Sequence, residues 1–181
     1  IQFSLKMRLG WENASECMVL VELLNTLRLS RIALHARTGK QQYKGHPDLE
    51  AFQGFYELCQ HPLYYNGDIE SLSDIRQILT RFPLLKGVFI GRGLLSSPLL
   101  AKEFKGNETF LPEQRMSIYF AFHEELFSAY SQVLQGETQL LVKMKTLWEY
   151  FLPETDRKLL KRIKKSTRLQ QYTESVKAIF T

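Results

Sequence analysis

The chain has 181 residues, of which 44% are hydrophobic, and a formal net charge of +5 at pH 7. This length and composition are ordinary for one globular domain or two small ones, and they exclude a disordered chain. With only two cysteines, Cys17 and Cys59, neither a disulfide framework nor a zinc site is expected. Because no apolar run approaches the ~20 residues of a membrane span, we expect a cytoplasmic protein that does not bind membranes.

The first part of the chain alternates short apolar strands with amphipathic helices. Strands are predicted at 1–8, 31–37, 62–67 and 86–93. Their apolar cores are typical of a parallel sheet that is buried on both faces. Asn13 with Glu16, and Ser71 with Asp74, predict capping boxes at the starts of two of the helices.

From Pro112 onward the strand signals almost vanish and apolar residues recur at helical spacing. The segment KGNETFLPEQ, which starts at Lys105, has the turn and breaker residues of a boundary. We therefore predict an α/β domain over 1–108 and an all-α domain over 109–181.

Four parallel βα units alone leave two sheet edges exposed. A doubly wound sheet can be built from four strands, whereas an eight-stranded barrel needs as many again. The sequence opens without methionine, inside a predicted strand. We therefore favour the second half of a (β/α)8 barrel, and we expect an N-terminal portion to be missing.

Polar side chains gather where the predicted strands end, which is where α/β barrels build their active sites. YNGDIES and IGRGLLSS each contain a glycine, Gly67 or Gly91, shortly before a predicted helix. Backbone N–H groups and a helix dipole favour an anion there, and Arg92 can bind two of its oxygens. This pattern predicts a phosphate site.

Lys6 and His35 are candidates for binding the rest of a cofactor. Strand alternation places Lys6 opposite its apolar neighbours, toward the barrel axis. A lysine beside a flavin ring would stabilise the anionic reduced ring, and His35 could hold the ring through an N–H group. The alternative interpretation of His35 is a hydrogen-bonded core histidine.

Four segments together resemble the tRNA-dihydrouridine synthase family. They are SLKMRLGW, LHARTGKQQYKG, YYNGDIES and GVFIGRGLLSSPLL, in this order and at this spacing. The resemblance implies an FMN-bearing barrel that reduces the C5–C6 double bond of particular tRNA uridines, with NADPH as reductant, followed by a helical tRNA-binding domain.

The resemblance also implies roles for individual residues. Lys6 and His35 would contact FMN, Asn66, Gly67 and Asp68 would lie along its phosphate side, and Gly91 and Arg92 would hold the phosphate. Residues bordering the RNA would be Arg37, Lys40, Gln41 and Tyr43. The family's catalytic cysteine belongs to an earlier strand, so no catalytic residue is expected in this chain, and neither cysteine matches it.

The C-terminal part adds a basic surface that suits an RNA partner. RKLLKRIKKSTR, from Arg157, holds seven basic residues in about three helical turns, among them Lys161, Lys164 and Lys165. Lys143, Lys145, Trp148 and Tyr150 on the preceding helix add charge and aromatic surface. The alternative is an ordinary solvated helix face.

Three functions remain open from the sequence. The first is a monomeric flavin-dependent tRNA reductase. The second is another FMN-dependent barrel oxidoreductase that acts on a small molecule, such as a relative of dihydroorotate dehydrogenase, which would leave the basic helices unexplained. The third is a non-catalytic RNA-binding fragment, which would carry no flavin.

Overall fold

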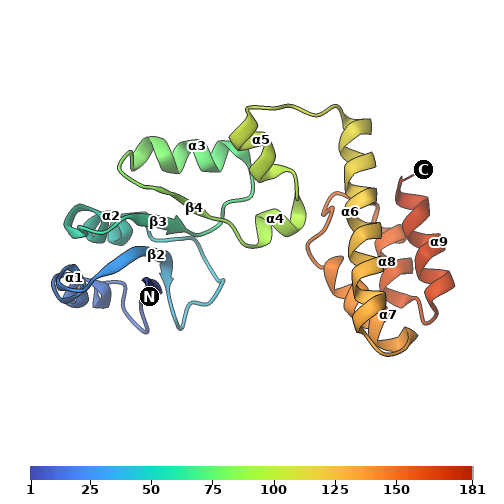
Figure 1. Ribbon diagram of the computed structural model, residues 1–181, viewed down its shortest axis with the longest axis horizontal. Coiled ribbons are helices and arrows are strands. Elements are labelled where there is room, and N and C mark those ends of the chain that lie inside the picture. The colour runs from blue at the N-terminus through green and yellow to red at the C-terminus, as the bar shows by residue number, and fades with distance from the viewer. Residues whose placement is uncertain (181) are drawn as a thin grey trace. The chain divides into compact units, whose positions relative to one another are not determined.

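The computed structural model describes residues 1–180 and divides into two compact units, with the division between Gly93 and Leu94. In the first unit strands and helices alternate, and in the described part of the second unit every element is a helix (Figure 1). The first unit contains β1 (Phe3–Gly10), α1 (Glu16–Thr26), β2 (Leu29–Thr38), α2 (Leu49–Leu58), β3 (Leu63–Asn66), α3 (Leu72–Arg81) and β4 (Gly87–Phe89). The division falls inside α4 (Arg92–Ser96).

The four strands form one parallel sheet in the consecutive order β1-β2-β3-β4. A doubly wound sheet would show a reversal of strand order, and none occurs among the described strands. The face that points to the helices is apolar, and Leu9, Ile32 and Leu34 on it have no exposed surface. The ring of Phe52 in α2 packs edge-on against Tyr65 of β3, with centroids 5.0 Å apart. The sheet is therefore singly wound, with its apolar face under the helices.

The α3 cap agrees with the prediction, because Ser71 and Asp74 form a complete capping box. The α1 cap does not. Asn13 makes no side-chain cap, and the helix begins at Glu16, whose carboxylate instead accepts the backbone N–H groups of residues 11, 12 and 13. These bonds lower the pKa of Glu16. The fourth strand is also shorter than predicted, because Arg92 already begins α4.

The second unit continues with helices that enclose their own core. They are α5 (Leu100–Gly106), α6 (Pro112–Val133), α7 (Glu137–Leu147), α8 (Arg157–Lys165) and α9 (Leu169–Phe180). Buried side chains from every one of these elements or their flanks meet in a single cluster, including Leu99, Met144 and Ile163. Among residues 1–180, no helix is long and apolar enough to cross a bilayer.

A buried polar chain lies within this core. The indole N–H of Trp148 donates to the Tyr172 hydroxyl at 3.0 Å, and that hydroxyl lies 2.6 Å from Nε2 of His123. Nδ1–H of His123 donates to the Glu124 carboxylate at 3.1 Å, so Nε2 of the neutral ring accepts the proton of the Tyr172 hydroxyl, which itself accepts from the indole. Burial lowers the pKa of His123, which keeps the ring neutral in this arrangement.

We expect Tyr172→Phe to lower the free energy of unfolding by about 1–3 kcal/mol, because it leaves two buried groups without a partner. Tyr130→Phe is the matched control in the same unit, since no hydrogen bond of its hydroxyl occurs among the described residues, and we expect a change within about 0.5 kcal/mol. Urea unfolding followed by Trp148 fluorescence measures both. Equal effects would contradict the inferred chain of hydrogen bonds.

Candidate functional site

The face of the sheet opposite the helices carries a row of polar and aromatic residues. The register pairs Arg8 with His35, His35 with Asn66, and Asn66 with Phe89, so these side chains point to one side. Lys6 pairs with Ala33, two residues earlier on β2 than His35, and therefore shares this face. The predicted orientation of Lys6 is consistent with this register, and its side chain is exposed.

Positive charge accumulates around His35, which is only 6% exposed. Burial first, and then the charges of Arg8, Lys6 and Arg37, lower its pKa to about 4, against a smaller opposite effect of Asp68. The pKa of Lys6 is also lowered, first by burial and then by Arg8. His35 is therefore neutral at pH 7 and can either donate or accept a hydrogen bond.

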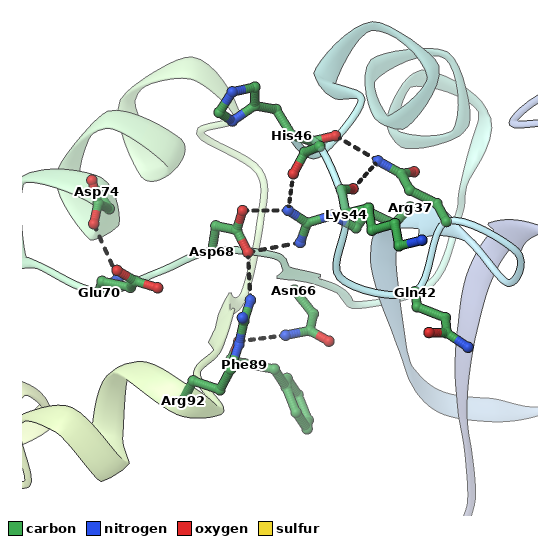
Figure 2. A network of polar contacts seen from close by, with 12 residues as sticks. Arg37, Gln42, Lys44, His46, Asn66, Asp68, Glu70, Asp74, Phe89 and Arg92 are labelled. Carbon is green, nitrogen blue, oxygen red and sulfur yellow. Dashed lines mark hydrogen bonds and ion pairs between the residues drawn. The ribbon is translucent and has the colours of Figure 1, made fainter. Parts of the chain in front are cut away.

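Asp68 is the centre of the polar contacts at the carboxyl edge of the sheet (Figure 2). Both of its oxygens accept from the buried guanidinium of Arg37, with a distance of 2.7 Å from NH1 to Oδ1. Arg92 donates to Oδ1 at 3.0 Å. These bonds, first of all those from Arg37, lower the pKa of Asp68, so it is a carboxylate at neutral pH. Asn66 lies beside this group and donates to the Phe89 carbonyl at 2.9 Å.

The loop that follows β2 closes over these side chains. Arg8 donates to the carbonyl oxygens of Thr38 and Gln42 at 2.7 and 2.9 Å. The Tyr43 ring lies against Arg92, whose guanidinium carbon is 4.6 Å from the ring centroid, and Arg8 lies 5.8 Å from the same centroid. Tyr43 is 62% exposed, so the ring still offers surface to a ligand.

The glycines at the carboxyl edge of the sheet differ in whether the surrounding structure leaves room for a side chain. Gly67 has a φ of +149°, and an added Cβ would lie 2.8 Å from the Tyr65 hydroxyl. An added Cβ at Gly93 would lie 2.1 Å from the Ile69 carbonyl oxygen, whereas one at Gly91 would meet nothing within 4 Å. Gly91 therefore has open space beside Arg92.

The N-terminus of α3 is capped by the protein's own side chains, which differs from the open anion site that we expected. The Asp74 carboxylate already accepts from the N–H groups of Glu70 and Ser71, at 3.0 and 2.8 Å. The protein's own carboxylate thus occupies the position that an anion would take at this helix end.

The four residues expected to border RNA lie in one loop region but in different environments. Arg37 is 1% exposed and points to Asp68, which differs from the expected contact with RNA. Lys40 is exposed and forms an ion pair with Glu12 at 2.5 Å. Gln41 shapes the loop by donating to the carbonyl oxygens of Lys44 and His46.

The basic residues of α8 lie on the surface around a buried stripe. Ile163 is fully buried, and the exposed basic residues of this helix and its C-terminal flank are Arg157, Lys158, Lys161, Arg162, Lys164, Lys165 and Arg168. A groove of about 420 Å³ between α8 and α9 is lined by Lys158, Lys161, Arg162 and Lys165, together with Gln171 and Glu174.

The preceding helix contributes less to this surface than expected. Trp148 is 2% exposed and belongs to the core, so its assignment as RNA-facing aromatic surface was wrong. Lys145 donates to the Ser166 carbonyl oxygen at 2.8 Å, at the C-terminus of α8. Lys143 stays exposed beside the ring of Tyr130.

Both cysteines are free thiols. Cys17 is buried in α1, and Cys59 is half-buried immediately after α2. Burial raises the pKa of both thiols, so neither environment favours proton donation or thiolate chemistry.

The family model described as Dihydrouridine synthase (Dus) matches residues 1–180. The chain belongs to the dihydrouridine synthase family. A probable tRNA-dihydrouridine synthase of Aquifex aeolicus is 36% identical over 105 residues, which cover 58% of this chain and 33% of the relative. A tRNA-dihydrouridine(16) synthase of Escherichia coli is 28% identical over 110 residues, with 60% and 35% coverage.

A further relative from Rickettsia bellii, also named probable tRNA-dihydrouridine synthase, is 25% identical over 140 residues, with coverage of 73% of this chain and 43% of the relative. The dihydrouridine synthase chain described here thus spans about a third of the length of the first relatives it matches, with 33% and 31% covered.

The low pKa of His35 predicts that the stability of this family member depends on pH. An unfolded histidine binds its proton near pH 6.5, and the folded one only near pH 4, so stability falls as the pH decreases through this window. The slope contributed by His35 is at most about 1.4 kcal/mol per pH unit. Urea unfolding at pH 7 and pH 5 should show a smaller loss in His35→Gln than in the parent, and an equal loss would contradict a buried neutral His35.

The two glycines beside Arg92 give a second prediction. Gly93→Ala should lower the free energy of unfolding of the first unit by about 1–3 kcal/mol, because its methyl group overlaps the Ile69 carbonyl. Gly91→Ala is the matched control and should change it by less than about 0.5 kcal/mol. Urea denaturation followed by circular dichroism tests both, and a Gly91→Ala variant that is as unstable as Gly93→Ala would contradict the packing described.

Proposed function

We propose that this chain is part of an FMN-dependent tRNA-dihydrouridine synthase that reduces the C5–C6 double bond of specific uridines in tRNA, with NADPH as reductant. Family membership over residues 1–180 supports the reaction class. The single observation that supports the site is the convergence of the polar sheet face on Asp68 and Arg92 at the carboxyl edge. We further propose that the protein acts as a monomer in the cytoplasm.

We propose that residues 1–108, which include the first unit, are the second half of a (β/α)8 barrel and that residues 109–181 are a tRNA-binding domain, although the division between the two compact units falls earlier, between Gly93 and Leu94. The consecutive strand order and the polar face opposite the helices both suit a barrel interior. Exposed apolar residues on α1 are evidence for a further neighbouring helix. Val19, Leu20 and Leu23 on one side of α1, and Leu27 at its C-cap, are 44–82% exposed. Such an apolar stripe on a surface helix is expected to be covered.

The residues at the carboxyl edge fit an FMN phosphate. Arg92 is about a third exposed, and Gly91 has space beside it for a ligand. Arg37, Arg92 and Asp68 together carry one net positive charge, which suits an anion. We propose that Gly91 and Arg92 hold the phosphate, while Asn66, Gly67 and Asp68 lie along its side.

Lys6 and His35 are proposed to hold the ring system from the same sheet face. Neutral His35 can donate a hydrogen bond to a ring oxygen or accept one from a ring N–H. The charge of Lys6 would stabilise negative charge on a ring beside it. FMN, when bound, supplies the hydride for the substrate carbon. Neither Cys17 nor Cys59 is proposed as the proton donor, because their burial raises both thiol pKa values.

The tRNA is proposed to contact the loop after β2 and the basic helices. Tyr43 offers an exposed ring for stacking on a base, with Lys40 and Gln41 beside it. On the second unit, the proposed phosphate contacts are Lys143, Arg157, Lys161, Lys164 and Lys165, with Lys145 placed at the C-terminus of α8. Arg37 is proposed to hold this loop in place through its hydrogen bond to the Gly45 carbonyl, rather than to contact RNA.

The RNA surface is tested by a pair of lysine substitutions. Lys161→Gln with Lys165→Gln removes two exposed cations from the α8 surface, so tRNA affinity should fall and the slope of log affinity against log salt should decrease by about 1.5. Lys86→Gln with Lys105→Gln is the control with the same change in total charge. Filter binding at several salt concentrations measures both, and equal effects of the two pairs would contradict a localised RNA surface.

The reaction itself is tested with the full-length protein of which this chain is proposed to be part, loaded with FMN and incubated with unmodified tRNA and NADPH. Mass spectrometry of the digested tRNA should show a uridine that has gained two hydrogens. Bound flavin without tRNA binding would favour an oxidoreductase acting on a small molecule. Binding of tRNA by a protein that takes up no flavin would favour a non-catalytic RNA-binding role.

A further inference from the structure

We propose that Arg37 is a positioning residue for the cofactor phosphate, acting through Asp68 rather than by contact with the cofactor or RNA. Arg37 neutralises the Asp68 carboxylate, so that Asp68 does not cancel the charge that Arg92 offers to the phosphate. The inference rests on the proposed FMN site and assigns a role within it to a residue that contacts neither ligand.

The contacts of Arg37 support this role. Its side chain is 1% exposed, so neither a nucleic acid nor a cofactor reaches it in this structure. Its two terminal nitrogens donate to the two oxygens of Asp68, and NH2 also donates to the Gly45 carbonyl at 2.7 Å. The planar guanidinium therefore fixes the carboxylate in two directions and ties it to the loop after β2.

Asp68 contacts both arginines, so its negative charge acts on Arg92 as well as on Arg37. Its side chain is 30% exposed, and one oxygen accepts from both arginines. The backbone of Asp68 has a φ of +38°, which is unusual for a residue other than glycine. Such a conformation persists only where surrounding contacts hold it, and the bidentate bond from Arg37 is one of these contacts.

The charges explain why Arg37 matters for a phosphate in particular. Asp68 alone would repel a phosphate and would neutralise the attraction of Arg92. With the buried charge of Arg37 on Asp68, one positive charge remains for the ligand at Arg92, which is about a third exposed. Without Arg37 the group would carry no net charge. The flavin ring, which carries no such anionic group, would be less affected.

The experiment compares the affinities of FMN and riboflavin, which differ only by the phosphate. Both ligands are titrated into the protein and followed by flavin fluorescence. Arg37→Met should weaken FMN binding by about tenfold or more and riboflavin binding by less than about threefold. The double variant Arg37→Met with Asp68→Asn removes both charges, and it should recover the FMN preference of the parent to within about threefold. Arg81→Met, which breaks the ion pair with Glu50 elsewhere in the first unit, is the control and should leave the preference unchanged.

The outcomes separate this inference from the proposed function. A parent protein that binds neither flavin overturns the FMN site itself. A parent that prefers FMN, together with an Arg37→Met variant of unchanged preference or a double variant that does not recover it, overturns only the role of Arg37. If Arg37→Met does not fold, the proposal is tested with the double variant, which contains no unpaired carboxylate. Loss of FMN preference in the double variant would then contradict the proposal.

Discussion

The alternation of side chains along four parallel strands is the constraint on which the first unit depends. Successive residues point to opposite faces, so Leu34 lies under the helices while His35 lies on the polar face. Register then aligns equivalent residues on neighbouring strands. A shift of one residue would bury the charged side chains and expose the apolar core. The same pairing that stabilises the sheet therefore assembles the candidate site.

At the carboxyl edge of the sheet, the fold holds a carboxylate between two arginines. Burying the charge of Arg37 is costly unless it is paired, and Asp68 supplies the partner. One nitrogen of Arg37, Nε, is buried with no hydrogen-bond partner among the described residues. A buried polar group without a partner is uncommon in folded proteins. The loop after β2 depends on the same arginine through its bond to Gly45.

The second unit combines a buried polar chain with an exposed basic surface. Trp148, Tyr172 and His123 satisfy one another inside the core, where an unpaired member would be costly. On α8, Ile163 is buried while the lysines around it are exposed. Core packing thus fixes which side of the helix faces solvent. The charge that favours an RNA partner is concentrated on that side.

Local patterns in the sequence were sufficient for much of this protein. They predicted the alternating strands and helices, the Ser71 capping box, the resemblance to the dihydrouridine synthases and the position of Asp68 and Arg92 at strand ends, because each depends on residues near one another in the chain. The tertiary structure alone decided that Arg37 is buried against Asp68, and that the indole N–H of Trp148 meets the Tyr172 hydroxyl inside the core. Both contacts join residues more than twenty positions apart in the chain, which periodicity cannot reveal.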